Sequence, residues 1–235
     1  MSLVELRTES GVAILTLNRP EKRNAMTHEM QAELAGLLRG AEADEAVRAI
    51  VFAGAGSDFC VGGDFDTVDR MRADSEHHDR LVRFHSDIAE CILSLAKPSI
   101  AAVQGRAFGF GAEIAAFCDM VVMSETARFA DPHVKMGLPP APGALVIWPQ
   151  RMSRAIAAEL MLTGRELRAD EALRLGLCNR VAPEGKELAE ALELARTLCE
   201  LPREGVMAVK RALRQSYKAL LAAGRDMQPG ATQGS

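Results

Sequence analysis

Residues 98–119 combine a buried-strand pattern, closely spaced glycines and a single glutamate. The apolar run Ser99–Val103 is followed by glycines within residues 105–111, and a helix-forming segment then carries Glu113. Glycine lets the backbone turn sharply and approach a ligand closely. A strand that turns into a helix leaves backbone N–H groups directed at one place, where they bind a negatively charged oxygen. The pattern therefore predicts an anion pocket beside a carboxylate, which suits enolate chemistry.

Two other interpretations of these glycines are open. The glycines alone also fit a tight turn with close packing of strand on helix and no ligand. Gly109-Phe110-Gly111 also resembles the start of the dinucleotide-binding motif G-x-G-x-x-G, but that motif needs a third glycine where position 114 is Ile. It also normally lies on the first strand-to-helix turn. The dinucleotide interpretation is therefore disfavoured.

A second glycine turn has the same design. Residues 59–65, F-C-V-G-G-D-F, follow a short apolar strand predicted at Ala49–Ala53. Adjacent strands of a layered α/β fold place such turns at one edge of the sheet, where two N–H groups could converge on one carbonyl oxygen. Losing one donor of such an oxyanion hole typically costs about 10²–10³ in rate. The paired turns therefore favour a site that stabilises a negatively charged oxygen during a reaction.

The elements that position these turns follow from the spacing of apolar residues. A two-stranded hairpin comes first, and Thr27 is the predicted N-cap of the first helix. Short strands and helices alternate up to residue 182, and amphipathic helices alone follow. This order predicts an α/β core, residues 1–182, and a C-terminal helical oligomerisation region, residues 183–235.

Composition narrows the classes of function. The 235 residues are 48% apolar and 26% charged, as in an ordinary globular protein, and the net charge of −4 argues against nucleic-acid binding. The five cysteines are far apart, so neither a disulfide framework nor a zinc site is predicted. His77, His78 and His85 fit a solvated helix surface better than a metal site, so no metal is expected. No signal peptide or membrane span is evident, and we expect a cytoplasmic protein.

Taken in order, the motifs resemble those of the crotonase (enoyl-CoA hydratase/isomerase) superfamily from Leu3 to about Leu221. The motifs are N-R-P-E-K-R-N-A-M at 18–26, the turn at 59–65, A-A-V-Q-G-R-A-F-G-F-G-A-E at 101–113, A-R-F-A-D-P at 127–132 and L-T-G-R at 162–165. The resemblance implies an α/β crotonase-like spiral of ββα units that forms a homotrimer or a dimer of trimers. It also implies an acyl-CoA substrate, with coenzyme A as part of the substrate and no separate cofactor.

The resemblance also implies roles for individual residues. The N–H groups of Gly63 and Phe110 match the two donors of the oxyanion hole. Many members have a small residue at the second position, so the side chain of Phe110 is expected to reshape the acyl pocket. The positions that bind CoA, two of them basic and suited to phosphate, fall on Lys22, Arg23, Ala25, Asp64 and Phe65.

Hydratases of this family hold the catalytic water with two glutamates. The first matches Glu113, whereas the second position is His133. An imidazole titrates near neutral pH, which suits acid/base catalysis. A surface or packing role for His133 is the other interpretation. Asp131 could orient His133, but we expect it to point to solvent.

Two further departures concern the loop after Gly137 and the end of the chain. The loop is rich in proline, which has no N–H to donate, and the helical pattern fades after Ala223, earlier than is usual for the family. The sequence predicts an enoyl-CoA hydratase/isomerase-type enzyme that uses Glu113. The alternatives are an acyl-CoA thioester hydrolase or other crotonase-type lyase, or a catalytically silent acyl-CoA-binding protein.

Overall fold

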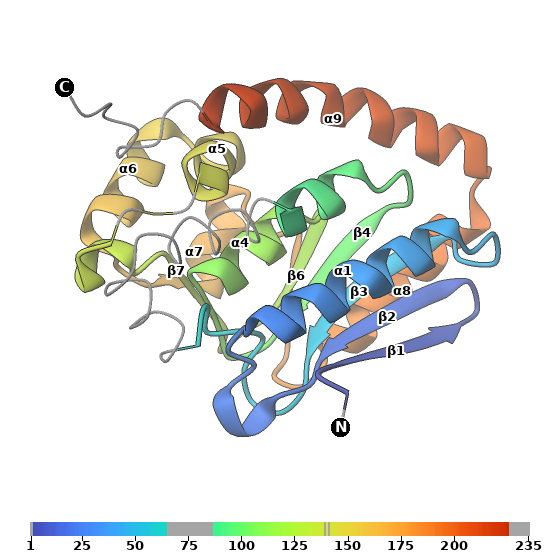
Figure 1. The fold of residues 1–235 in the computed structure, drawn as a ribbon, viewed down its shortest axis with the longest axis horizontal. Helices are drawn as coiled ribbons and strands as arrows, with labels where there is room; N and C mark the ends of the chain where they lie inside the picture. The colour runs from blue at the N-terminus through green and yellow to red at the C-terminus, as the bar shows by residue number, and fades with distance from the viewer. Residues whose placement is uncertain (1, 65–86, 139, 141, 226–235) are drawn as a thin grey trace.

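The computed structural model describes residues 2–64, 87–138, 140 and 142–225 and is built around a six-stranded sheet (Figure 1). The order is β1-β2-β3-β4-β6-β9, in which β1 and β2 form an antiparallel hairpin and the later neighbours pair in parallel. These strands span Val4–Glu9, Val12–Leu17, Ala49–Gly54, Ser99–Val103, Met120–Ser124 and Arg180–Ala182. A second sheet, β5-β7-β8, spans Arg106–Phe108, Arg128–Ala130 and Leu167–Arg168.

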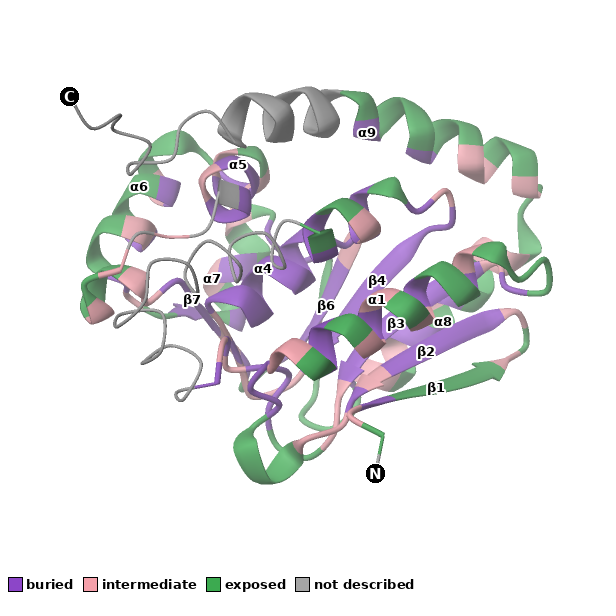
Figure 2. Ribbon diagram, viewed as in Figure 1, coloured by how far each residue is buried: buried purple, intermediate pink, exposed green. Residues whose placement is uncertain are grey.

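The central strands are buried on both faces, as their continuous apolar sequences require (Figure 2). Helix α8, Glu187–Glu200, packs on one face and shares a hydrophobic cluster with β2, β3, β4 and β6. On the other face, helices α1, His28–Ala43, and α4, Phe110–Phe117, contribute to the larger hydrophobic cluster. Helix α8 therefore packs on the main sheet. The proposed domain boundary at residue 182 stays a prediction.

Further short helices and 3₁₀ turns lie among the described residues. They are α5, Pro142–Arg151; α6, Arg154–Thr163; α7, Ala169–Leu175; and the 3₁₀ turns η1, Pro20–Lys22, and η2, His133–Met136. Residues 87–94 are also helical. The Thr27 hydroxyl accepts a hydrogen bond from the Met30 N–H at 3.3 Å, so the predicted N-cap of α1 is confirmed.

Helix α9, Arg203–Arg225, crosses the molecule and is anchored by two buried cations (Figure 1). Lys210 Nζ lies 2.9 Å from Asp119 Oδ2, and Arg214 Nη2 lies 3.1 Å from Asp119 Oδ1. The same carboxylate accepts from the Ser99 N–H at 2.7 Å, at the start of β4. Because Asp119 lies between α4 and β6, this cluster fastens the long helix to the layer that carries Glu113.

The predicted α/β class and the two C-terminal amphipathic helices are confirmed. The prediction missed β5 and β8, which are three and two residues long. His77, His78 and His85 lie outside the described residues, and within the described ranges no three or more His, Cys, Asp or Glu side chains gather as metal ligands would. No helix in the described part of the chain is both long and apolar enough to cross a membrane.

Candidate active site

The two glycine turns lie directly against each other. Cys60 forms a parallel bridge with Ala107, and its carbonyl accepts from the Phe108 N–H at 2.9 Å. Gly62 has a φ of +98°, and a Cβ on it would lie 3.1 Å from the Phe108 oxygen and 3.7 Å from the Phe110 nitrogen. The expectation that both turns share one edge of the fold is therefore confirmed.

The backbone directions at the two turns follow from their hydrogen bonds. The Met26 N–H donates to the Gly62 oxygen at 2.8 Å, and the Asp64 N–H donates to the Met26 oxygen at 3.1 Å. In this parallel pattern the residue between them, Gly63, directs its own N–H away from Met26. Phe110 is the first residue of α4, so its N–H points out of the helix end, while its side chain is buried in the core.

Glu113 is a buried carboxyl group in the first turn of α4. Its residue is 1% exposed, and Oε1 has no hydrogen-bond partner among the described residues. Gly143, at the start of α5, packs on it, since a Cβ there would lie 3.1 Å from Glu113 Oε2. Burial raises the pKa of Glu113 well above its usual range, and the negative charge of Asp131 adds to that effect. The surroundings of Glu113 therefore favour its protonated form.

His133 lies beside the start of α4. A Cβ on Gly109, whose φ is +50°, would lie 3.5 Å from His133 Cε1 and 3.9 Å from Nε2. The imidazole side chain is 16% exposed, and its Nδ1 is hydrogen-bonded to Asp131 Oδ1. The structure therefore brings His133 to the same turn as Phe110 and the helix that carries Glu113.

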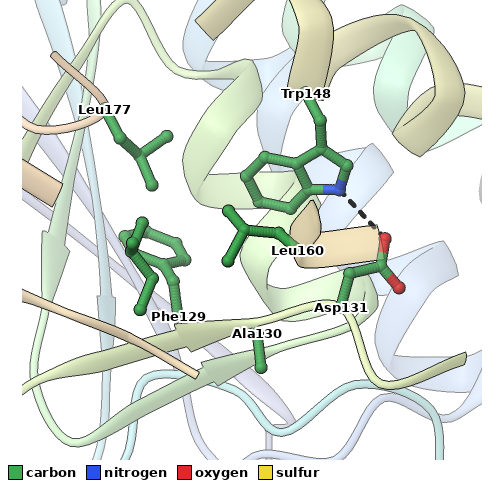
Figure 3. A pocket seen from close by; sticks show the side chains of 7 residues that line it. Phe129, Ala130, Asp131, Trp148, Leu160 and Leu177 are labelled. Carbon is green, nitrogen blue, oxygen red and sulfur yellow. Dashed lines mark hydrogen bonds between the residues drawn. The ribbon is translucent and has the colours of Figure 1, made fainter. Parts of the chain in front are cut away.

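The expectation that Asp131 points to solvent is wrong. Asp131 is 4% exposed, and its Oδ2 accepts from Trp148 Nε1 at 2.9 Å (Figure 3). Burial acts to raise the pKa of Asp131. The hydrogen bonds from His133 and Trp148, together with the neighbouring imidazole, lower it by more than burial raises it, so the net pKa is below its usual range. The buried carboxylate turns inward because two ring N–H groups are available there.

Trp148 is the residue of this cluster that sequence reasoning missed. It packs edge-to-face on Phe129, with ring centroids 6.5 Å apart, and both rings line an apolar pocket with Leu160 and Leu177 (Figure 3). A buried indole N–H needs an acceptor. The single tryptophan of the chain was therefore a signal that a nearby carboxylate or carbonyl is buried with it.

The segment predicted to contact the CoA nucleotide lies next to the first glycine turn. Lys22 and Arg23 are exposed and Ala25 is buried. The Val61 N–H donates to the Arg23 oxygen at 3.3 Å, which joins the segment to the turn. Asp64 pairs with Arg19, whose Nη1 lies 2.7 Å from its Oδ2. Phe65, the last of the predicted CoA-binding residues, lies outside the described residues.

Asn24 fixes this segment from inside. It is fully buried, and both it and Arg23 have left-handed backbone angles, with φ values of +56° and +53°. Its Oδ1 accepts from the Arg19 N–H at 2.8 Å, and its Nδ2 donates to the Ala55 and Asp58 oxygens at 2.9 and 2.7 Å. These bonds hold a conformation that is unfavourable for residues other than glycine.

Comparison with known proteins shows the family of the chain. A profile described as enoyl-CoA hydratase/isomerase matches residues 7–232. A probable enoyl-CoA hydratase of Rhizobium meliloti (strain 1021) is 35% identical over 226 residues, 93% of this chain and 84% of the relative. A 1,2-epoxyphenylacetyl-CoA isomerase of Escherichia coli (strain K12) is 33% identical over 230 residues, 97% of this chain and 88% of the relative.

A crystal structure of an enoyl-CoA hydratase/isomerase from Mycobacterium paratuberculosis superposes with a TM-score of 0.89. Its sequence is 34% identical, and the match covers 96% of this chain and 90% of that one. The fold is thus the crotonase fold. The chain belongs to the enoyl-CoA hydratase/isomerase family of enzymes, within the crotonase superfamily.

Proposed function

We propose that this protein adds water to, or shifts the double bond of, an enoyl-CoA thioester. The thioester oxygen would be held by the N–H groups of Gly63 and Phe110, which stabilise it as negative charge develops in an enolate-like transition state. Glu113 and His133 would exchange protons with the acyl chain. The single observation that carries this proposal is the buried Glu113 carboxyl, placed one turn into the helix that begins at the paired glycine turns.

The environment of Glu113 supports an acid/base role. An unpaired buried polar group is destabilising, and one that borders a candidate site is available for chemistry there. Glu113 Oε1 has no such partner among the described residues. A raised carboxyl pKa also brings proton transfer closer to neutral pH, where a catalytic group is most effective.

The test is Glu113→Gln, which preserves size and removes the titrating proton. We expect turnover of enoyl-CoA substrates to fall by at least about 10²-fold, with binding of acyl-CoA measured by calorimetry little changed. Glu187→Gln is the matched control, because Glu187 is also a buried glutamate with an unpartnered oxygen but lies on α8, which packs on the main sheet. It is expected to retain wild-type turnover.

The assay should follow both loss or gain of the conjugated double bond and release of free CoA thiol, over 2-enoyl-CoAs and 3-enoyl-CoAs of several chain lengths. A change in conjugation without thiol release supports the proposal. Thiol release alone would indicate a hydrolase instead. Tight acyl-CoA binding with no reaction of any substrate would indicate a silent binding protein. Unchanged turnover in Glu113→Gln would remove the assigned role.

We also propose a homotrimer or a dimer of trimers in the cytoplasm. Three large apolar side chains are more than 60% exposed on α6 and α9, namely Leu162 at 74%, Leu213 at 68% and Val209 at 62%. Val209 and Leu213 lie one turn apart on α9, so they share a helix face, and an exposed apolar face supports an interface between subunits. The free cysteines fit a reducing compartment. Sedimentation equilibrium tests the assembly, and a monomer at micromolar concentration would contradict it.

A further inference from the structure

Each oxygen of Asp131 is hydrogen-bonded to a ring nitrogen. Trp148 Nε1 donates to Oδ2 at 2.9 Å, and His133 Nδ1 lies within hydrogen-bond reach of Oδ1. An indole nitrogen can only donate, and an ionised carboxylate can only accept. The hydrogen on the His133 ring must therefore be on Nδ1, and the lone pair of the neutral ring is on Nε2.

We propose that Asp131 is a positioning residue, itself oriented by Trp148, that makes His133 Nε2 the proton acceptor of the active site while Glu113 is the proton donor. This deepens the proposed function and rests on it. The arrangement divides the work between an imidazole and a carboxylic acid.

The direction of the imidazole supports this assignment. The edge of the ring that carries Cε1 and Nε2 faces Gly109, where a side chain would come within 3.5 Å of Cε1. Gly109 has no side chain, so nothing of that residue lies between Nε2 and the N-terminal end of α4. His133 is thus held at its Nδ1 edge by Asp131 and presents Nε2 to the turn that contains Phe110.

The two carboxyl groups of the site have opposite environments. Asp131 has two hydrogen-bond donors and a lowered pKa despite its burial. Glu113 is buried with an unpartnered oxygen and has a raised pKa, because of burial and, second, the charge of Asp131. Environments that push two titratable groups apart in this way separate the acid from the base. The raised pKa therefore favours Glu113 as the proton donor, and the bond between Nδ1 and Asp131 leaves Nε2 as the ring nitrogen that can take a proton.

In a hydration the protons and electrons balance as follows. His133 Nε2 removes a proton from water as the water oxygen bonds to the β-carbon, and the electron pair of the double bond moves onto the thioester oxygen. The enolate collapses as Glu113 gives its proton to the α-carbon. The imidazolium then returns a proton to the Glu113 carboxylate, directly or through solvent, so the enzyme is unchanged and one water has been added.

Other charged groups near His133 come from its own turn and from the helix packed on it. Lys135 lies in η2, and its side chain packs on Gly164 rather than on the imidazole. Helix α6, which packs on η2, carries Arg154 and Glu159, and Glu159 is paired with Arg165 at 2.6 Å. Asp131 is thus the carboxylate that the structure places on the ring.

The first experiment measures the tautomer of His133 by nitrogen-15 NMR of the unliganded protein, with His133→Gln used to assign the signal. The wild type is expected to carry its proton on Nδ1. In Asp131→Asn, Trp148 still donates to the amide oxygen, so the NH₂ group faces the imidazole and the proton moves to Nε2. The value of kcat should then fall by about 10²–10⁴-fold with a small change in KM, as when a triad aspartate is replaced by asparagine.

The double variant Asp131→Asn with Trp148→Phe provides the sharper test. Without the indole N–H, the amide is able to turn over and present its oxygen to the imidazole. The Nδ1–H tautomer and part of kcat should return, so the double variant should be at least several-fold more active than Asp131→Asn alone. Asp170→Asn, at an exposed aspartate of α7, is the control and should change neither readout.

Retention of the Nδ1–H tautomer in Asp131→Asn, with kcat within about threefold of wild type, would overturn the positioning role. If Asp131→Asn does not fold, the tautomer and kcat of Trp148→Phe alone decide, since a lost indole donor should loosen the ring and lower kcat by about tenfold. An unchanged kcat and a single sharp tautomer there would count against the inference. If Asp131→Asn inverts the tautomer but the wild-type protein turns over no enoyl-CoA, the proposed function is overturned while the positioning role stands.

Discussion

Arg19 and Asp64, 45 residues apart in sequence, form an ion pair with Nη1 2.7 Å from Oδ2. The same Nη1 donates to the Ala25 oxygen at 3.0 Å. One guanidinium therefore joins the segment predicted to meet CoA to the turn that carries Gly63. Both side chains are largely buried, at 19% and 12% exposure, so solvent screens the pair less than a surface ion pair.

Replacement of this arginine should loosen the nucleotide side of the site more than the chemistry. Arg19→Met keeps the aliphatic length but removes both hydrogen bonds. We expect the free energy of unfolding to fall by about 1–3 kcal/mol and KM for acyl-CoA to rise several-fold, with a smaller change in kcat. Urea unfolding and steady-state kinetics measure the two effects. Arg180→Met, which breaks the exposed pair with Glu190, is the control and should change neither.

Asn24 should be far more sensitive than its neighbour Asn18. Asn24→Ala removes the side chain that is hydrogen-bonded to three backbone groups. It also places an alanine, which can make no side-chain hydrogen bonds, in a left-handed conformation. Each loss is worth about 1–3 kcal/mol, so the variant should be at least about 3 kcal/mol less stable in urea unfolding. Asn18→Ala removes two exposed hydrogen bonds and should lower the free energy of unfolding much less. Equal losses in both variants would contradict the role assigned to Asn24.

A substitution at Gly143 tests whether turnover depends on the position of the Glu113 carboxyl. Gly143→Ala adds a Cβ 3.1 Å from Glu113 Oε2 and 2.9 Å from Phe117 Cζ. The carboxyl must move, so turnover of an enoyl-CoA should fall by about tenfold or more, as small misplacements of catalytic groups do. Gly36→Ala in α1, where nothing lies within 4 Å, should leave turnover unchanged and raise stability by about 0.5–1 kcal/mol. Unchanged turnover in Gly143→Ala would show that the position of the Glu113 carboxyl is not critical.

Asp119 should give the protein a specific sensitivity to acid. Burial acts to raise the pKa of Asp119, but the charges of Lys210 and Arg214 and their hydrogen bonds lower it more, so the folded-state pKa is below the usual value. A carboxylate of this kind stabilises the fold above its unfolded pKa, near about 4, and that stability is lost as pH falls through the folded pKa. Asp119→Asn also leaves two buried cations without their counter-ion and should cost about 3–5 kcal/mol at pH 7.

The acid limb, meaning the fall of unfolding stability with pH below about pH 4, distinguishes this effect from a general loss of packing. Urea unfolding of Asp119→Asn should show a flatter fall in stability below about pH 4 than the wild type. Asp170→Asn, at an exposed ion pair with Arg168, should keep the wild-type acid limb. Parallel acid limbs in wild type and Asp119→Asn would exclude the ion pair as the source of the pH dependence.

Lys22 and Arg23 should act on the nucleotide part of the ligand alone. Both side chains are exposed. A double charge reversal, Lys22→Glu with Arg23→Glu, should raise KM for acyl-CoA by about tenfold or more at low salt, and less at high salt because exposed charges are screened. KM for the same acyl group on pantetheine, which lacks the nucleotide, should not change. A similar rise with both substrates would place the effect on the acyl site instead.

Local patterns were sufficient to predict much of this fold. Thr27 and the apolar spacing after it predicted α1, and the glycines around Phe110 predicted the turn into α4. The short strands β5 and β8 have three and two residues, too few for a periodic signal, and both pair with β7, which is distant from them in sequence.

The site was less predictable where contacts join distant residues. Asp131 and Trp148 are 17 residues apart and meet because α5 packs against α4 beside the end of β7. Asp119 and Arg214 are 95 residues apart. Local sequence patterns contain the residue types but not these pairings, which is why the prediction that Asp131 faces solvent is wrong. Burial of a charged group depends on which donors the tertiary fold brings to it.

The loop pinned by Asn24 also affects how a ligand arrives. Fixing the backbone of one residue costs roughly 1–2 kcal/mol of conformational entropy, and here folding has already ordered the segment from Arg19 to Met26. Encounter with the nucleotide would then need no rearrangement of this segment. Its association rate would be governed by diffusion and by the exposed charges of Lys22 and Arg23, and would fall steadily as ionic strength rises.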